Sequence, residues 1–414
     1  MRDVYVIGVG MLRFGKYLTA TIKSMAEEAV NLALKDCGLD KHQLQSAYVS
    51  NSFWGMFNNQ HSIRGQVALR AMGIQGIPIV NTENACAGAS TALHLAYMGI
   101  AAGAFDVSLA LGVEKISNEN KALSLMSYAS CIDVEKTEEQ INLLSQLDKL
   151  YSPQSVQDQP GMNRSIFMDI YAAAARWHMA KYGSTQRQLA VISAKNHFHG
   201  SLNPLAQIQK DMSVEEVLND PLVSYPLTRA MCSPVGDGAA AAILCSEDFL
   251  YKLFKKTRVR PVKILASILG SGRDRPIDGV DIGERLSRQA YQVAGLGPED
   301  IDVVELHDAS AFGELHQLEA LGFCPPGEGG IFSETGATRL GGKLPVNTSG
   351  GLESRGHPIG ASGLAQIHEI VTQLRGEAGK RQVEGARIGL TENGGGNIGY
   401  EEAAMTIHIF ESIK

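Results

Sequence analysis

The stretch "GASTALHLAYMG" (residues 88–99) has a counterpart in "GASGLAQIHEIV" (residues 360–371). Both open with Gly-Ala-Ser and then place apolar residues at three- and four-residue spacing, which is typical of a helix with a buried face. A second pair, "CGLDKHQLQSAYVSN" (37–51) and "AGLGPEDIDVVELHD" (294–308), precedes the first in each half of the chain. Each of its members combines a Gly-Leu helix end, a polar turn and an apolar strand. Because the order is kept, we interpret the chain as two related halves, with chance recurrence of common motifs as the alternative.

Apolar runs around these segments predict the sheet. The runs "VSLALGV", "AAAAILC", "VVELH" and "RIGLT" have the apolar density of buried strands, and they alternate with helical patterns. Such alternation favours a layered α/β fold with a mostly parallel sheet covered on both faces. We place the division of the chain after residue 262, which gives an N-terminal half (1–262) and a C-terminal half (263–414).

Residues from about 118 to 231 do not follow the repeat. They are polar and loop-rich at first, as in "SPQSVQDQPGMNR" (152–164), and then helical through "YAAAARWHMAKYG" (171–183) and "RQLAVISAKNH" (187–197). We interpret this region as an insertion carried by the first half. Long excursions of this kind are commonly lids or binding loops.

Composition excludes several classes of protein. The 414 residues carry a net charge of −7 without a dense block of lysine and arginine, which argues against a nucleic-acid surface or a polybasic membrane patch. Six scattered cysteines without CxxC spacing indicate a reducing compartment rather than a disulfide framework. No apolar run reaches the ~18 residues of a membrane-spanning helix. We therefore expect a soluble, cytoplasmic protein.

The first candidate catalytic residue is Cys86, in "NACAGAST" (84–91). A thiol at the start of a helix faces the positive end of the helix dipole and free backbone N–H groups, which favour the thiolate. The small residues around it allow a substrate carbonyl to approach. The alternative is a buried cysteine that acts as a small hydrophobic residue.

His357 is the second candidate, in "SGGLESRGHPIGASG" (349–363). A histidine between glycine and proline is held on a tight turn, and a fixed imidazole is the base that a nucleophilic thiol requires. A surface turn is the alternative. His357 precedes Gly360 by about as many residues as Cys86 precedes Gly88, so a pseudo-two-fold axis between the halves would bring the two side chains together.

His307 and Asp308 form the third candidate site, in "VVELHDASAFGEL" (303–315). They follow a buried strand directly, and α/β folds place ligands at the carboxyl ends of parallel strands. His307 could donate a hydrogen bond to an oxygen that becomes negative. A structural His-Asp pair is the equal alternative.

The fourth candidate is the glycine run of "TENGGGNIGYEEA" (391–403). Gly394, Gly395 and Gly396 follow the strand "RIGLT" and could expose backbone N–H groups at the same sheet edge, or form a loose turn. Two other motifs are interpreted as structural. "GVG" (8–10) lacks a dinucleotide fingerprint, and "NHFHG" (196–200) lacks a metal-ligand partner, so we expect no metal site.

In this order and over nearly the whole chain, the four segments resemble the thiolase superfamily, and within it the sterol-carrier-protein-type (SCP2) thiolases with their acetyl-CoA acetyltransferase-like bacterial and archaeal members. "NACAGAS" is similar to the nucleophile segment, "GHPIGASG" to the catalytic histidine segment, and "HDASAFGEL" to the HDCF block of that subgroup. "MCSPVGDGAAAAILCSEDF" and "YGSTQRQLAVISAKNH" are also similar to subgroup segments. The resemblance implies the thiolase fold, with duplicated βαβαβαββ halves in five layers, αβαβα, and an inserted loop domain.

The resemblance also implies chemistry on coenzyme A thioesters, with CoA as co-substrate and no permanently bound cofactor. Cys86 would attack the 3-keto carbon of a 3-oxoacyl-CoA while His357 takes its proton, and the reverse Claisen condensation would use the same groups. The backbone N–H groups of Cys86 and of Gly394 or Gly395 would form one oxyanion site, and His307 would bind the thioester oxygen.

Two departures from the thiolase pattern concern the second acid. Typical thiolases carry a second cysteine near the C-terminus, where this chain has Glu392 or Asn393, and SCP2-type members place a cysteine where this chain has Ala309. We expect Glu392 to act in its place, with Asp308, Tyr400 or a water molecule as alternatives, and we expect an unusual branched or aromatic acyl group. The substrate contacts we expect are Asp308, Ser310, Asn347, Gly350 and Tyr400.

Two other functions are alternatives. One is a retro-aldol lyase on a 3-hydroxyacyl-CoA, like the steroid side-chain aldolases, and the other is a non-catalytic acyl-CoA-binding subunit. The lyase needs a base but no acyl-cysteine, so the retained Cys86 thiol argues against it, and retention of Cys86 with His357 argues against the non-catalytic subunit. The resemblance further implies a homodimer and makes plausible a small partner subunit with a zinc ribbon and an OB-fold of the DUF35 type.

Overall fold

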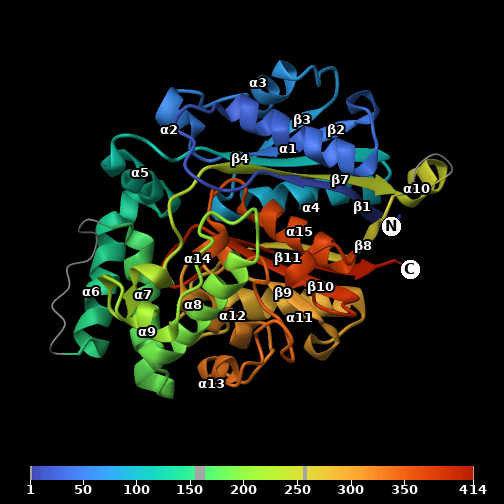
Figure 1. The fold of residues 1–414 in the computed structure, drawn as a ribbon. Helices are drawn as coiled ribbons and strands as arrows, with labels where there is room; N and C mark the ends of the chain where they lie inside the picture. Colours follow the sequence, from blue (N-terminus) through green and yellow to red (C-terminus); the bar gives the residue numbers. More distant parts are fainter. Residues whose placement is uncertain (1, 154–163, 255–258, 414) are drawn as a thin grey trace.

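A continuous nine-stranded β-sheet forms the centre of the molecule, stacked in two layers that we call the first and the second sheet (Figure 1). The structure is a computed structural model that describes residues 2–153, 164–254 and 259–413. The strands follow one another across the sheets in the order β3-β2-β4-β7-β1 and β8-β11-β10-β9. The two sheets join where Tyr5 and Val6 of β1 pair with Lys263 and Val262 of β8.

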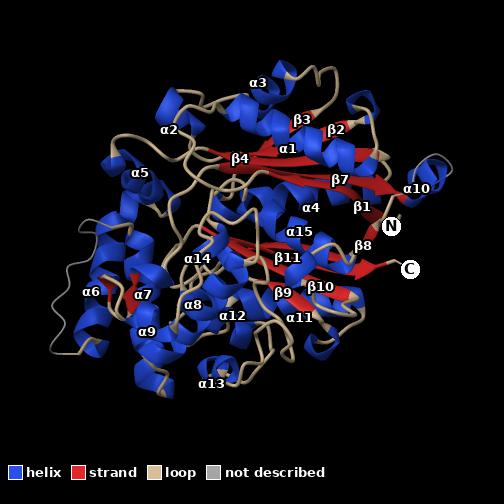
Figure 2. Ribbon diagram, viewed as in Figure 1, coloured by secondary structure: helices blue, strands red, loops and turns tan. Residues whose placement is uncertain are grey.

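The elements alternate as the sequence predicted (Figure 2). The first half contains β1 (Val4–Met11), α1 (Ile22–Cys37), β2 (Ser46–Ser50), α2 (Trp54–Asn58), α3 (Arg64–Ala71), β3 (Ile79–Thr82), α4 (Gly88–Ala101), β4 (Val107–Glu114), β7 (Gly238–Ser246) and α10 (Glu247–Phe254). The second half contains β8 (Val262–Ser271), α11 (Ile282–Ala294), β9 (Val303–Glu305), α12 (Ala311–Ala320), α13 (Gly329–Glu334), α14 (Gly351–Arg355), α15 (Ser362–Leu374), β10 (Ile388–Gly395) and β11 (Ala404–Ser412). The division after residue 262 stays a proposed boundary.

The strand order repeats between the halves, in keeping with the sequence duplication. In the first half the third strand, β3, pairs in parallel with β2 at the sheet edge. In the second half the same place is taken by a single parallel bridge from Val346 to Val304 of β9. The other four strands match one to one: β1, β2, β4 and β7 correspond in order to β8, β9, β10 and β11.

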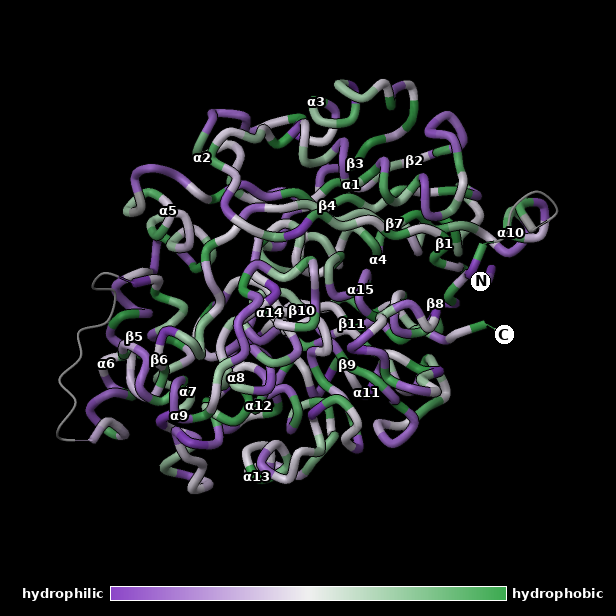
Figure 3. The backbone as a smooth tube through the Cα atoms, viewed as in Figure 1, coloured by the Kyte–Doolittle hydropathy of each residue, from purple (hydrophilic) through white to green (hydrophobic). Residues whose placement is uncertain are grey.

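The layers are helix, sheet, helix, sheet, helix, as the thiolase resemblance implies. Helices α4 and α15 lie between the two sheets, where Leu93 and Ile367 belong to one apolar core with residues of both sheets. Helix α1 covers the outer face of the first sheet, and α11 covers the outer face of the second. Hydrophobic residues follow the strands β1, β4 and β7, which are buried on both faces (Figure 3).

The expectation of a mostly parallel sheet was wrong. The pairs β2–β3, β2–β4 and β9–β10 are parallel. The pairs β1–β7, β4–β7, β8–β11, β10–β11 and β1–β8 are antiparallel. The reason is that each half ends with two consecutive strands, and the last strand inserts beside the first in antiparallel orientation.

The insertion contains α5 (Lys121–Ser127), α6 (Thr137–Tyr151), α7 (Ile166–Tyr182), α8 (Gln186–Ser201), α9 (Val214–Leu218), β5 (Leu222–Ser224) and β6 (Leu227–Thr228). Its helical pattern was predicted correctly, and it lies between β4 and β7 in the sequence of the first half. Ala172 of α7 and Leu189 of α8 share an apolar core with Phe312 of α12, so these two helices pack on the second half. Most of the polar stretch 152–164 lies outside the described residues.

Candidate active site

Cys86 lies in a single 3₁₀ turn, η2 (Ala85–Ala87), between β3 and α4. Ala85 has a left-handed φ of 47°, a strained conformation for a residue with a side chain, directly before the thiol. The end of β10 packs against this turn so closely that a Cβ at Gly395 would lie 2.2 Å from Asn84 O. Only glycine permits this approach, which places the glycine run beside Cys86 as the sequence suggested.

His357 lies on the turn between α14 and α15, and its ring is held by a hydrogen bond. Ser362 Oγ donates to Pro358 O at 3.0 Å, and it therefore accepts a hydrogen bond from His357 Nδ1 at 2.7 Å. This bond assigns the proton to Nδ1 and leaves Nε2 as a proton acceptor. His357 is consequently in the tautomer that a general base for a thiol needs.

His307 follows β9 and is held in the opposite tautomer. Asn393 Nδ2 donates to His307 Nδ1 at 2.9 Å, while Ser90 Oγ donates to Asn393 Oδ1 at 2.7 Å. The backbone N–H of His307 donates to Glu392 Oε2 at 2.9 Å. Because Nδ1 accepts, Nε2 carries the proton, and His307 can donate to an oxygen in the cavity.

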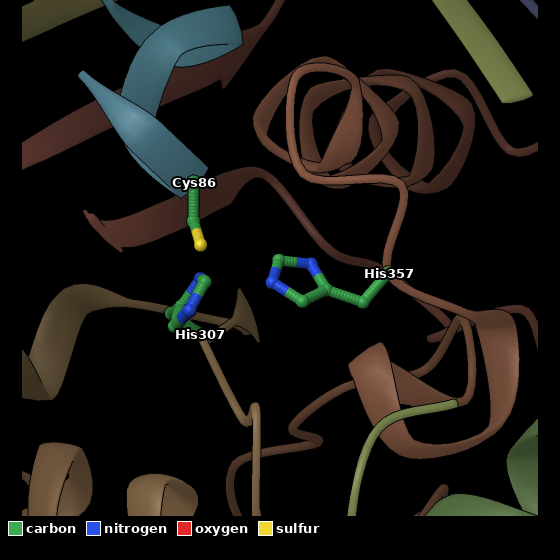
Figure 4. Close-up of side chains that lie close together, drawn as sticks. All are labelled: Cys86, His307 and His357. Atoms are coloured by element: carbon green, nitrogen blue, oxygen red, sulfur yellow. The ribbon is translucent and has the colours of Figure 1, made fainter. Parts of the chain in front are cut away.

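Cys86, His307 and His357 point toward one another from three separate segments (Figure 4). One sulfur and two ring nitrogen atoms, one from each residue, lie within 4.8 Å of one another. The two imidazole rings are edge to face, with centroids 5.1 Å apart. The duplication therefore brings the thiol of the first half and the imidazoles of the second half together. The same three atoms would also fit a thiophilic metal ion, which the sequence analysis did not expect.

Burial sets the protonation states of the three residues. It raises the pKa of the Cys86 thiol well above its ordinary value, and Cys131 and Glu83 raise it further. It also lowers the pKa of His357 well below the ordinary value and that of His307 to about 3. The expectation that the helix start favours the thiolate was wrong, because loss of water outweighs the helix dipole and the N–H groups. The resting site holds a neutral thiol beside a neutral base.

The three residues line a cavity of about 540 Å³. Its walls are largely apolar and include Leu125, Tyr128, Phe167, Met168, Met212 and Val223. Lys210 and Arg229 also line it, with 64% and 71% of their side chains exposed. The cavity therefore joins a buried thiol to a solvent-exposed rim formed by the insertion, where Arg229 is paired with Asp220.

Four predicted substrate contacts, Asp308, Ser310, Asn347 and Gly350, do not line this cavity. They are buried beneath it. Asp308 accepts hydrogen bonds from Leu352 N and Asn196 Nδ2, and Asn347 bonds to Leu306 N and Glu314. These residues hold the loops of the site in place.

Glu392 and Tyr400 also lie apart from the thiol. Glu392 is fully buried behind the His307 backbone and does not line the cavity. Tyr400 lines a second, smaller cavity of about 90 Å³, which shares Phe167, Tyr171, His307, Gly396 and Glu402 with the first.

Several ionisable residues of the main cavity were missed by sequence reasoning, among them Cys131, Tyr171 and Glu402. Cys131 and Tyr171 belong to the insertion, whose position over the site could not be read from the chain. Glu402 stands in the quoted motif "TENGGGNIGYEEA", but alternation along a strand could not indicate the direction of a side chain in the loop between β10 and β11.

The sequence profiles of known families match the chain in two parts. The profile described as "Thiolase, N-terminal domain" matches residues 4–248, and "Thiolase C-terminal domain-like" matches residues 280–408. The chain belongs to the thiolase family. It is 40% identical over 415 residues to "Acetyl-CoA acetyltransferase" of Methanothermobacter thermautotrophicus, which covers 99% of this chain and 100% of that protein.

Two further thiolase relatives are similar over nearly the whole chain. "Benzoylsuccinyl-CoA thiolase subunit BbsB" of Thauera aromatica is 36% identical, covering 95% of each chain. "Sterol carrier protein 2" of Bos taurus is 37% identical, covering 98% of this chain and 74% of that protein. These relatives place the chain with the SCP2-type thiolases, as the motifs indicated, and identify it as a thiolase-type acyltransferase.

Solved structures share the thiolase fold. The "Ltp2-ChsH2(DUF35) aldolase" has a TM-score of 0.76 at 23% identity and covers 99% of this chain and 98% of that chain. Human mitochondrial 3-ketoacyl-CoA thiolase in complex with CoA has a TM-score of 0.70 at 18% identity and covers 100% of this chain and 98% of that one. Within the described ranges, none of the helices has both the length and the apolar character needed to cross a bilayer.

Proposed function

We propose that this thiolase cleaves or forms the C2–C3 bond of a 3-oxoacyl-CoA through an acyl-cysteine on Cys86. The observation that carries the proposal is the convergence of Cys86, His357 and His307, with reactive atoms within 4.8 Å, on one cavity. The opposite tautomers of the histidines supply one proton acceptor and one proton donor, which are the two groups that Claisen chemistry requires beside the thiol.

Cleavage begins when His357 Nε2 takes the proton of Cys86. The sulfur attacks C3, the C2–C3 bond breaks, and its electron pair moves to C2, which leaves the enolate of an acyl-CoA. His307 Nε2–H donates to the thioester oxygen of this enolate, and the N–H groups of Cys86 and the glycine run face the C3 oxygen. A proton is then added at C2.

The second half of the reaction transfers the acyl group. The sulfur of free CoA attacks the thioester on Cys86, the Cys86 sulfur leaves, and a shorter acyl-CoA is released. A buried and neutral Cys86–His357 pair suits this cycle. His357 carries the proton of Cys86 only while the sulfur reacts as a thiolate or as a thioester.

The walls of the cavity support a bulky apolar acyl group, either aromatic or branched. Tyr128, Phe167 and Met168 form an apolar surface on the insertion side. The name of the relative BbsB, a benzoylsuccinyl-CoA thiolase subunit, supports an aromatic group. The exposed cations Lys210 and Arg229 support binding of the CoA phosphates at the rim.

Two partners belong to the proposal. A homodimer is supported by β3, which ends the first sheet and leaves Val80 of the strand 42% exposed. A small DUF35-type subunit is supported by the name of the structural neighbour, an Ltp2-ChsH2(DUF35) aldolase. Val80→Lys would weaken a dimer formed at β3, which light scattering measures.

The decisive experiment follows the acyl group. The purified protein, alone and with any neighbouring OB-fold subunit, is incubated in EDTA with 3-oxoacyl-CoAs that include 3-oxo-3-phenylpropionyl-CoA. We expect acyl mass on the Cys86 peptide, and a loss of thiolysis of ~10³-fold or more in Cys86→Ala. Cys324→Ala, a cysteine outside the cavity lining, is the matched control. Cleavage of the corresponding 3-hydroxyacyl-CoAs that survives Cys86→Ala would instead support the retro-aldol lyase.

A further inference from the structure

We propose that the carboxyl group of Glu402 is the acid and base that adds and removes the proton at C2 of the acyl-CoA. The assignment rests on the proposed thiolase reaction and names the group that takes the role of the absent second cysteine. Glu402 lies in the loop between β10 and β11, at the end of the same hairpin that carries the glycine run.

Glu402 stands at the junction of two cavities. It lines the main cavity together with Cys86, His307 and His357, and it also lines the smaller cavity of about 90 Å³. His307 is shared in the same way. The carboxyl group and the imidazole therefore border the same passage, from which both can reach a bound thioester.

The glycine run makes room for this side chain. A Cβ at Gly394 would lie 3.0 Å from Glu402 Cγ, so the Glu402 side chain is packed directly on the strand that adjoins Cys86. Gly395, the next residue, contacts the turn that holds the thiol. Glu402 is thus connected to the nucleophile through two consecutive glycines of β10.

The two adjacent glutamates have different environments. Glu401 forms ion pairs with Arg275 and Arg285 and is fully engaged in the structure. Glu402 forms no ion pair within the part of the chain that is described, and its side chain is half-buried at the cavity wall. Burial and the nearby Asp281 together raise the pKa of Glu402 to about 7, against the lowering effect of His316 and Arg275. A carboxyl group with that pKa can both donate and accept a proton near neutral pH.

The chemistry places C2 within reach of this group. His307 is the donor for the thioester oxygen, and C2 is bonded to the carbon that carries that oxygen. A proton carrier for C2 must therefore lie beside His307 and open into the same space. Glu402 lines both cavities that His307 lines, whereas Glu392 lines neither and accepts a hydrogen bond from the His307 backbone.

Other ionisable groups of the main cavity fit the role less well. Glu353 accepts a hydrogen bond from Asn196 and lines the main cavity, but it does not line the smaller cavity that His307 and Glu402 share. Burial raises the pKa of Cys131 to about 12, too high for ready donation and return of a proton at neutral pH. Tyr171 lies near Glu402, and burial raises its pKa well above the ordinary value.

The proton balance closes without a further reactant. In cleavage, His357 takes the proton of Cys86, and protonated Glu402 gives its proton to C2 and becomes a carboxylate. His357 then releases its proton to solvent, and Glu402 recovers one from solvent. When CoA accepts the acyl group, the proton of its thiol is released, and the Cys86 sulfur takes one up. Condensation runs the same transfers in reverse.

The test separates proton transfer at C2 from acyl transfer. Parent and Glu402→Gln enzymes are incubated with acetyl-CoA, propionyl-CoA or succinyl-CoA in D₂O, with free labelled CoA and with any OB-fold subunit that the parent requires. Deuterium at C2 reports the proton carrier, and exchange of labelled CoA into the acyl-CoA reports the acyl-cysteine. We expect Glu402→Gln to lose ~10²- to 10⁴-fold in C2 exchange and thiolysis while CoA exchange stays within threefold of the parent.

Three variants control the experiment. Glu402→Asp, which keeps the carboxyl group, is expected to retain more C2 exchange than Glu402→Gln. Glu299→Gln removes an exposed carboxylate and is expected to leave both readouts unchanged. Tyr171→Phe tests the neighbouring phenol and is expected to retain C2 exchange. Thermal unfolding of each variant identifies loss of the fold.

The outcomes are distinct. C2 exchange at the parent rate in folded Glu402→Gln would overturn the assignment, as would a parent that acylates Cys86 but exchanges no C2 hydrogen. A parent that never acylates Cys86 would overturn the proposed thiolase reaction itself. Loss of CoA exchange together with C2 exchange in folded Glu402→Gln would show a structural role and overturn the assignment.

Discussion

Asn393 donates a hydrogen bond to Nδ1 of His307 at 2.9 Å, and this contact decides which nitrogen of His307 faces the cavity with a proton. Asn393 lies on β10 and His307 follows β9, so two adjacent parallel strands supply the pair. The amide is itself held by Ser90 at the start of α4. His307, the proposed donor to the substrate oxygen, is therefore positioned by both halves of the duplicated fold.

Replacing Asn393 by aspartate should remove this donor. A carboxylate accepts from Nδ1–H, which leaves Nε2 without a proton toward the cavity. We expect Asn393→Asp to lower kcat of thiolysis by ~10²- to 10³-fold, the range for loss of one oxyanion donor. Nitrogen-15 NMR of the imidazole would detect the change of tautomer, and an unchanged tautomer with full activity would contradict the assigned hydrogen bond.

The reactivity of Cys86 should depend steeply on pH. Burial raises its pKa, so the thiol stays protonated at neutral pH and the thiolate fraction rises with each pH unit above it. We expect the rate of alkylation by iodoacetamide at Cys86 to increase continuously from pH 6 to pH 9, measured by peptide mass spectrometry. A rate that is constant between pH 6 and pH 8 would indicate a resting thiolate–imidazolium pair instead.

Proton exchange at C2 should follow the ionisation of Glu402. Exchange requires the carboxylate, so its rate should rise as pH increases through about 7 and then level off, whereas the cleavage step requires the protonated form and should slow over the same range. The groups that face Glu402 are Glu392 from β10, Tyr171 from α7, His316 from α12, and Asp281 and Arg275 before α11. Glu402→Gln should abolish the pH dependence between 6 and 8.

The ionisation of Glu392 should make the free energy of unfolding depend on pH. Burial raises its pKa to about 8, so the folded protein holds a proton that the unfolded chain releases above its ordinary pKa of 4.5. The free energy of unfolding therefore falls as pH rises from 4.5 to 8, and Glu392→Gln removes this loss. We expect the stability of the variant relative to the parent to increase between pH 5 and pH 8, by up to ~1.4 kcal/mol per pH unit.

Urea denaturation of both proteins at pH 5 and pH 8 measures this difference. Because glutamine can still accept the hydrogen bond from the His307 backbone, Glu392→Gln should keep at least a tenth of the parent activity. A loss of more than one hundredfold in a folded variant would support the catalytic role that the sequence suggested for Glu392. An equal stability difference at both pH values would mean that the carboxyl group is not protonated in the folded state.

Local patterns in the sequence predicted much of this fold. The sequence predicted Cys86 at a helix start and His357 on a turn. These predictions were possible because glycine, proline and the spacing of apolar residues determine the backbone conformation of the few residues around them. The internal repeat predicted their meeting, since related halves bury equivalent helices side by side. The direction of β7 and the packing of the insertion on α12 were missed, because antiparallel pairing and docking depend on contacts between segments far apart in sequence.

The sequence by itself determined the elements and the duplication, and it predicted Cys86 as the nucleophile with His357 as its base, because these follow from short-range spacing and from motifs that resemble thiolases. Only the tertiary structure decided the protonation of Cys86, the tautomers of the two histidines and the choice of Glu402 over Glu392 as the carboxyl group at the cavity. The physical reason is that pKa values and hydrogen-bond partners depend on which distant segments pack around a side chain and exclude water from it. The spacing of residues along the chain does not show which segments these are.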